Sequence, residues 1–199
     1  MSREFGIIPA RIEDAPLIAR AVMMAVGEDI CRDFAGDDHS VEDVEALFTE
    51  LAAMDDSQYS YRNTLVALDP EGKVAGVCVA YDGALLHRLR RRFFEAAKRR
   101  LNRDMEGMAD ETSPDEFYLD TLAVWEPYRG NGLGRRLLLA QAARAHAAGK
   151  PAGLLVDKDN PKAEALYRHL GFTPAGERPF AGVVMNHLQL TKPVDQQQS

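Results

Sequence analysis

A glycine-rich segment with flanking arginines is the stretch of this chain best suited to chemistry. It reads Arg129-Gly130-Asn131-Gly132-Leu133-Gly134-Arg135 and joins a strand-like run, residues 117–124, to a run with helical spacing that ends near Gly149. A glycine turn that opens a helix exposes several backbone N–H groups, and the helix dipole adds positive potential there. Such a turn can bind phosphate, because glycine lacks the Cβ that would block close approach.

The spacing of the glycines narrows the kind of phosphate ligand. A mononucleotide loop has Lys and then Ser or Thr after its last glycine, whereas Arg135 and Arg136 follow Gly134 here. The dinucleotide fingerprint would need a glycine three residues after Gly132, at the position of Arg135. Coenzyme A is the remaining phosphate-bearing cofactor with a matching pattern. An ordinary strand–turn–helix corner is the alternative interpretation.

A second segment favours the coenzyme A interpretation. Residues 160–172 follow an apolar run at 152–156 and read Asn-Pro-Lys-Ala-Glu-Ala-Leu-Tyr-Arg-His-Leu-Gly-Phe. An Asn at a helix start, a Tyr seven residues later and a Gly-Phe pair, combined with Arg-x-x-Gly-x-Gly at 129–134, resemble the acetyl-CoA segments of the GNAT superfamily of N-acetyltransferases. The resemblance is clear from about residue 65 to residue 190.

The resemblance implies acetyl-CoA as cosubstrate and assigns residues to it. Backbone groups at the end of the strand would hold the pantetheine arm and polarise the thioester carbonyl. Asn160 can cap the helix that it begins, and the resemblance adds a cofactor contact. The implied cofactor-binding set is Leu122, Ala123, Val124, Arg129, Gly130, Asn131, Gly132, Leu133, Gly134, Arg135, Asn160 and Tyr167.

Acetyl transfer to an amine needs a neutral amine, donors for the oxyanion and a proton for the leaving thiolate. Alternation along a strand places five residues on one face: Glu116, Tyr118, Asp120, Leu122 and Val124. The family often has a base carboxylate there, so the resemblance makes Asp120 the first candidate base and Glu116 the second. Tyr167 matches the family's general acid, and a phenol with a pKa of ~10 keeps its proton at neutral pH. The alternative for Asp120 and for Glu116 is an ordinary solvated or paired carboxylate. The alternative for Tyr167 is an aromatic side chain of the core.

The helices and strands expected around these residues indicate one α/β domain over residues 1–192. A disordered tail is expected at 193–199. Strands followed by helices, with a final hairpin, fit a sheet of mixed direction. The resemblance implies a mostly antiparallel sheet of about seven strands with flanking helices, of the acyl-CoA N-acyltransferase type, whose fourth and fifth strands splay apart for the cofactor. The expected strands cover 5–9, 63–68, 73–81, 117–124, 152–156, 172–176 and 183–190, and the expected early helices cover 10–27 and 40–54.

Residues 83–114 are predicted to be a helical insertion between the third and fourth strands. Leu86, Leu89, Phe93, Ala97 and Leu101 recur at three- and four-residue steps, which favours an amphipathic helix. This part of the chain is basic, whereas the N-terminal half is acidic. We expect the basic side to be solvated or to pair with the acidic half. A lid over the acceptor, or a contact for the cofactor's 3′-phosphate, is the sharper alternative.

Residues 28–40 are predicted to be an acidic loop. Ser40 should then cap the next helix in a Ser-x-x-Asp arrangement with Asp43. If the loop borders the acceptor site, its carboxylates would favour a cationic amine.

Composition sets the remaining limits. The 2 cysteines and 5 scattered histidines have no ligand spacing, so we expect no metal. No apolar run suits a membrane span or a signal peptide, and the net charge of −7 argues against a nucleic-acid partner. We therefore predict a cytoplasmic N-acetyltransferase, either monomer or homodimer, that moves acetyl from acetyl-CoA to a primary amine of a small molecule or peptide by direct attack. The alternatives are a non-catalytic CoA-binding module of the same fold and a basic-helix adaptor.

Overall fold

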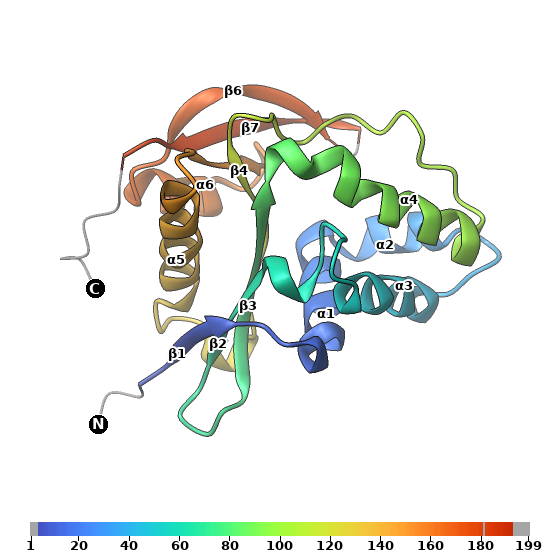
Figure 1. Cartoon of the computed structure of the whole chain (residues 1–199), viewed down its shortest axis with the longest axis horizontal. Helices are drawn as coiled ribbons and strands as arrows, with labels where there is room; N and C mark the ends of the chain where they lie inside the picture. The colour runs from blue at the N-terminus through green and yellow to red at the C-terminus, as the bar shows by residue number, and fades with distance from the viewer. Residues whose placement is uncertain (1–3, 181, 193–199) are drawn as a thin grey trace.

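The computed structural model contains a seven-stranded sheet with helices on both faces (Figure 1). It describes residues 4–180 and 182–192, so the predicted tail at 193–199 lies outside the described residues. All neighbouring strands are antiparallel except β4 and β5, which confirms the predicted mixed sheet. The strand order is β1 (Gly6–Pro9), β2 (Thr64–Leu68), β3 (Val74–Asp82), β4 (Phe117–Val124), β5 (Ala152–Val156), β7 (Val183–Leu190) and β6 (Thr173–Phe180).

Two groups of helices cover the sheet (Figure 1). One face packs against α5 (Leu133–Ala147) and α6 (Pro161–His169), whose apolar side chains meet those of β3, β4 and β5. The other side carries α1 (Ala15–Val26), α2 (Glu28–Ala35), α3 (Val41–Ala53) and α4 (Leu86–Leu101), which share a second core. Short 3-10 turns lie at Ile12–Asp14, Tyr61–Asn63, Gly83–Leu85 and Glu126–Tyr128. None of the helices in the described ranges is long and apolar enough to cross a membrane.

The prediction of an acidic loop after α1 is wrong for most of that segment. Residues 28–35 form the helix α2 rather than a loop, with Cys31 and Ala35 buried and the acidic side chains exposed. The apolar residues recur one and four residues apart, a helical signal that the charges obscured. The next helix starts as predicted, because Ser40 Oγ accepts from the Asp43 N–H at 3.2 Å and Asp43 accepts from the Ser40 N–H at 2.9 Å.

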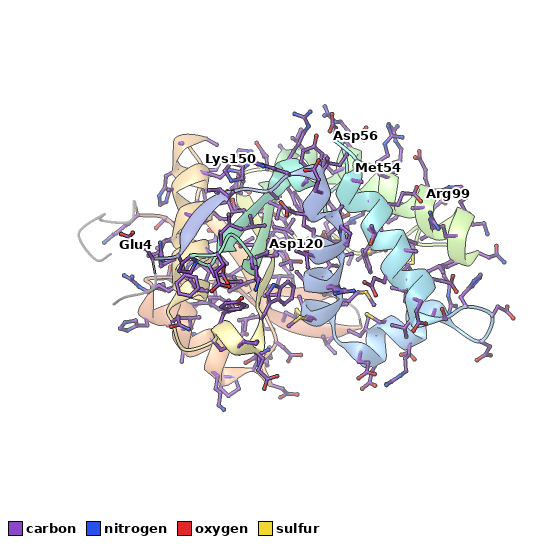
Figure 2. The ribbon with its side chains drawn as sticks, turned by 90° about the horizontal axis from the view of Figure 1, so that it is seen from below. Glu4, Met54, Asp56, Arg99, Asp120 and Lys150 are labelled. Atoms are coloured by element: carbon purple, nitrogen blue, oxygen red, sulfur yellow. The ribbon has the colours of Figure 1, made fainter. Side chains whose placement is uncertain are left out.

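The insertion contains the predicted amphipathic helix, α4, which buries Leu89, Phe93 and Leu101. Its basic residues pair with carboxylates of the N-terminal half. Arg92 Nη2 lies 2.7 Å from Asp56 Oδ2, and both Arg99 and Arg100 contact the Glu50 carboxylate. Figure 2 shows Asp56 and Arg99 toward the outside of the molecule and Asp120 near its centre. The expected electrostatic pairing with the acidic half is therefore confirmed.

β4 contains a bulge at the position of the first candidate base. Thr121 lies opposite Val79 of β3 and Leu119 lies opposite Ala80, so Asp120 has no partner across this ladder. The extra residue reverses the alternation of side chains that follows it. Leu122 and Val124 pack on the α5 side, whereas Tyr118 packs with Tyr81 on the other. The prediction that residues 116–124 keep one alternating face is thus wrong beyond Asp120.

β4 and β5 pair at only two positions. Phe117 lies opposite Ala152 and Tyr118 opposite Gly153, and beyond these pairs the strands separate. This is the splay expected from the resemblance, and it positions the site.

Candidate functional site

A cavity of about 760 Å³ opens where β4 and β5 separate. The sheet supplies its floor, the ends of α1 and α2 supply one wall, and α6 and the β6–β7 hairpin supply the others. The lining residues are Met24, Ala25, Val26, Ile30, Tyr59, Glu111, Tyr118, Asp120, Thr121, Leu122, Leu155, Val156, Asp157, Asp159, Asn160, Ala163, Tyr167, Phe180, Val183 and Met185. The structure thus brings together Asp120, Asn160 and Tyr167, three residues singled out by the sequence.

Asp120 is the titratable group best suited to accept a proton in this cavity. Its side chain is half-buried, and its carboxylate lies 2.9 Å from Thr121 Oγ1 and 3.3 Å from Tyr81 Oη. Burial raises the pKa of Asp120 to about 6 and outweighs the hydrogen bond from Thr121, which acts in the opposite direction. A carboxyl group with this pKa can be ionised at neutral pH and still accept a proton.

Glu116, the second candidate base, has a different environment. Its carboxylate is fully buried and accepts hydrogen bonds from Thr112 Oγ1, Gln189 Nε2 and the Ser113 N–H, and it contacts His187 Nε2 at 2.7 Å. Burial alone would raise its pKa, but the hydrogen bonds outweigh burial and hold the pKa at about 2. These properties favour a structural role that joins β4 to β7.

Tyr167 lies on α6 and faces the same cavity as Asp120. Its ring packs edge-on against Phe172, with ring centroids 6.0 Å apart. Burial raises the pKa of its hydroxyl to about 12, so the hydroxyl retains its proton at neutral pH. Tyr167 therefore combines the two interpretations from the sequence, since it belongs to a core cluster and also lines the cavity.

The glycine-rich loop has the geometry of a phosphate cradle. Gly130 and Gly132 adopt positive φ angles of 79° and 72°, and a Cβ added at either would meet open space. The hydrogen bonds found among the described residues include none donated by the backbone N–H groups of residues 131–135. Arg129 Nε fixes the loop through Val124 O at 3.2 Å. These free donors at the start of α5 can hold an anion.

Three further cofactor candidates lie in the loop or on the wall of the cavity. Leu133 is buried beneath the loop, whereas Arg135 is half-buried beside it. Asn160 Oδ1 accepts from the Ala163 N–H at 3.1 Å, so the predicted helix cap is confirmed, and the same residue lines the cavity.

Ile30 is the residue of the acidic segment 28–40 that lines this cavity, and the acidic side chains of the segment are not in its lining. Asp33, Asp37 and Asp38 line a separate hollow of about 860 Å³, next to Arg32 and Arg103. These three carboxylates therefore do not line the cavity, and their effect on an acceptor stays a prediction. Instead, the carboxylates around the cavity are those of Glu111, Asp120, Asp157 and Asp159, and its lining in the described chain contains no Lys or Arg.

Sequence reasoning missed Tyr81 and Glu111. Glu111 is 1% exposed and lies in the segment after α4, and its Oε1 accepts from Tyr81 Oη at 2.8 Å. The contact spans 30 residues and follows no local pattern. The signal in the sequence was a tyrosine near the end of a mostly apolar strand.

Comparisons with known proteins agree with this geometry. The model of the acetyltransferase (GNAT) family matches residues 29–172. A solved structure described as an acetyltransferase superposes with a TM-score of 0.78 at 33% identity, covering 96% of this chain and all of the other. An N-acetyltransferase from Staphylococcus aureus Mu50 has the same fold, with a TM-score of 0.75 at 24% identity over 93% of this chain and all of that one.

Curated relatives match over a shorter stretch. N-alpha-acetyltransferase RimI of Mycobacterium tuberculosis is 42% identical over 67 residues, which is 34% of this chain and 41% of that protein. An uncharacterised protein of Mycobacterium leprae is 46% identical over 69 residues, which is 34% of this chain and 18% of that protein. The match thus spans less than half the length of either relative.

Proposed function

Because the chain belongs to the acetyltransferase (GNAT) family, we propose that it moves an acetyl group from acetyl-CoA to a primary amine by direct attack in a ternary complex. The observation that carries the proposal is the cavity between β4 and β5, which Asp120 and Tyr167 line together. Acetyl-CoA would supply the activated thioester, and the protein would bind, orient and exchange protons.

The cradle at the start of α5 fits the pyrophosphate of acetyl-CoA. Free N–H groups at residues 131–135 can donate to its oxygens, and the open space over Gly130 and Gly132 allows the phosphates to approach the backbone. Asn160 lies on the cavity wall near the end of β5, where it can contact the pantetheine arm. The end of β4 after the bulge, residues 122–124, would hold the thioester.

Two proton transfers complete the proposed reaction. Asp120 would take a proton from the incoming ammonium or amine, which its pKa of about 6 permits at neutral pH. Tyr167 would give its proton to the departing thiolate. Glu116 has no part in either transfer, because its carboxylate is fully committed to hydrogen bonds.

The charge of the cavity supports a cationic acceptor. Glu111 is paired with Arg90, but the carboxylates of Asp120, Asp157 and Asp159 line a space that described basic side chains do not line, so an ammonium group would be attracted to it. The peptide N-terminus is one such amine, and the name of the Mycobacterium tuberculosis relative, an N-alpha-acetyltransferase, makes it a class to test.

A thiol-release assay with acetyl-CoA tests the proposal across polyamines, amino acids, aminoglycosides and peptides. We expect release with at least one cationic amine, and Asp120→Asn should reduce turnover about 10²–10⁴-fold, the usual span for a positioned base. Calorimetry with acetyl-CoA serves as the control. Binding without release on any amine would contradict catalysis and support the non-catalytic CoA-binding module.

A further inference from the structure

We infer that the buried pair of Arg90 and Glu111 positions the Tyr81 hydroxyl and, through it, Asp120, which makes the insertion at residues 83–114 part of the catalytic apparatus. The mechanistic value of this positioning rests on the proposed role of Asp120 as base. Glu111 and Arg90 would act through Tyr81, so both are positioning residues.

Arg90 fastens the end of the insertion to α4. Its side chain is 3% exposed, and its guanidinium donates to Met108 O at 3.2 Å, Ala109 O at 3.1 Å and Asp110 Oδ1 at 3.0 Å. It also forms an ion pair with the Glu111 carboxylate, which is itself 1% exposed. A fully buried ion pair is costly to desolvate, and here it holds one carboxylate at a fixed point beside the cavity.

The Tyr81 hydroxyl connects this carboxylate to Asp120. Tyr81 Oη lies 2.8 Å from Glu111 Oε1 and 3.3 Å from Asp120 Oδ2. A hydroxyl has one proton and two lone pairs, so it can donate to only one of the two carboxylates. Donation to the nearer one, Glu111, turns a lone pair toward Asp120.

This orientation favours the protonated form of Asp120. A lone pair repels an ionised carboxylate and accepts a hydrogen bond from a carboxylic acid. When Asp120 takes a proton from the amine, its new O–H can donate to Tyr81 Oη, while the Tyr81 proton stays on the bond to Glu111. No further proton is moved, and the charge of Glu111 remains balanced by Arg90.

The other groups near Asp120 do not carry a compensating charge at neutral pH. Cys78 on β3 has a pKa raised by burial to about 12. Burial also raises the pKa of Tyr59, Tyr81 and Tyr118 well above the usual value. Arg90 and Glu111 are therefore the charged pair that faces Asp120 from the insertion.

The test measures the pKa of Asp120 directly and needs no acetyl transfer. Aspartate carboxyl ¹³C shifts are titrated by NMR, with Asp120→Asn to assign the signal. Glu111→Gln should lower the pKa of Asp120 by about one unit, because the hydroxyl can then turn and donate to Asp120. Asp110→Asn is the control, because it removes a carboxylate that contacts the Arg90 guanidinium but not Tyr81. This variant should leave the pKa of Asp120 unchanged.

Two further variants keep the inference falsifiable. If Glu111→Gln does not fold, Glu111→Asp replaces it, since it retains a charge beside Arg90 but withdraws the carboxylate from the hydroxyl. In a Tyr81→Phe background, the shift caused by Glu111→Gln should shrink to less than half. An unchanged pKa in the Glu111 variants, or an equal shift in the Tyr81→Phe background, would overturn the inference.

Activity provides the second readout. If the chain transfers acetyl groups, the acidic limb of kcat/KM should move by the same amount and in the same direction as the NMR titration. A purely structural role for Glu111 would lower the melting temperature and leave both titrations in place. A chain that moves the NMR titration but transfers no acetyl group would contradict the proposed function alone.

Discussion

Two carboxylates of one strand region have opposite properties, and their surroundings explain why. Glu116 is enclosed by donors that stabilise its charge, whereas Asp120 lies at a bulge beside a cavity and has few donors. Environments that push two pKa values apart are a common way to separate a structural carboxylate from one that exchanges protons. The difference makes Asp120 the better candidate base.

At the scale of single residues, the first prediction concerns the Tyr167 hydroxyl. Replacing Tyr167 with Phe keeps the ring against Phe172 and removes only the hydroxyl. If this hydroxyl protonates the thiolate, turnover should fall about 10²–10⁴-fold while the affinity for acetyl-CoA changes little. Steady-state kinetics and calorimetry measure the two quantities. Wild-type turnover in this variant would assign the proton to water or another residue.

Glu116 gives a prediction about stability. Its folded-state pKa of about 2 lies below its usual value of 4.5, so Glu116 stabilises the fold above pH 4.5, and this contribution is lost as the pH falls toward 2. Glu116→Gln should therefore lower the free energy of unfolding by about 2–3 kcal/mol at pH 7. Urea unfolding between pH 7 and pH 3 checks this result. A variant that loses as much stability at pH 3 as at pH 7 would contradict it.

At the scale of elements, the sequence predicted most of the parts that position the site. The strand at 117–124 and the final strand at 183–190 have the predicted bounds, and the capping box of α3 is present. These elements have strong local signals, namely apolar runs and a capping residue. The glycine loop also follows from a local pattern, whereas Asp120 was chosen as first candidate base from the family resemblance.

What the sequence did not predict depends on contacts between distant elements. The bulge at Asp120 is set by pairing with β3, and its only local trace is the polar pair Asp120-Thr121 inside an apolar strand. The Glu111–Tyr81 contact joins an insertion to a strand, and no sequence period encodes it. The helix α2 was missed because its many charges suggested a loop.

The glycine loop carries the prediction for an element. Gly132→Val should reduce acetyl-CoA affinity at least about 10-fold, because a branched side chain would fill the space over the free N–H groups. Gly72→Val is the matched control, since Gly72 also has a positive φ, of 81°, and open space around it, but lies in the β2–β3 turn. Calorimetry compares the two variants. Equal losses in both would assign the effect to backbone strain.

At the scale of the whole molecule, the charged side chains are unevenly paired. The basic helix α4 neutralises carboxylates of the N-terminal half, while Asp157 and Asp159 remain exposed at the cavity wall. The acidic wall is therefore available to an approaching ammonium group.

Replacing Asp157 and Asp159 together with Asn should raise the KM for a cationic amine about two- to fivefold at low salt, and less at high salt. The matched control is Asp37→Asn with Asp38→Asn, which removes the same charge from the separate hollow near Arg103. Initial rates at two ionic strengths make the comparison. A KM that responds equally to both pairs would show that only the net charge matters.

The two-residue pairing of β4 and β5 has a mechanical consequence. The sheet has two parts, one of strands β1 to β4 and one of strands β5, β7 and β6, which are joined by the two residue pairs between β4 and β5. Glu116 strengthens this junction through its contacts with His187 and Gln189 of β7. A ligand bound between β4 and β5 would contact both parts of the sheet and restrict their relative motion. Amide hydrogen exchange in β5 and β7 should therefore slow when acetyl-CoA binds, while exchange in β2 and β3 changes little. The strength of the same β4–β5 junction would then determine how readily the two parts of the sheet separate to release the product.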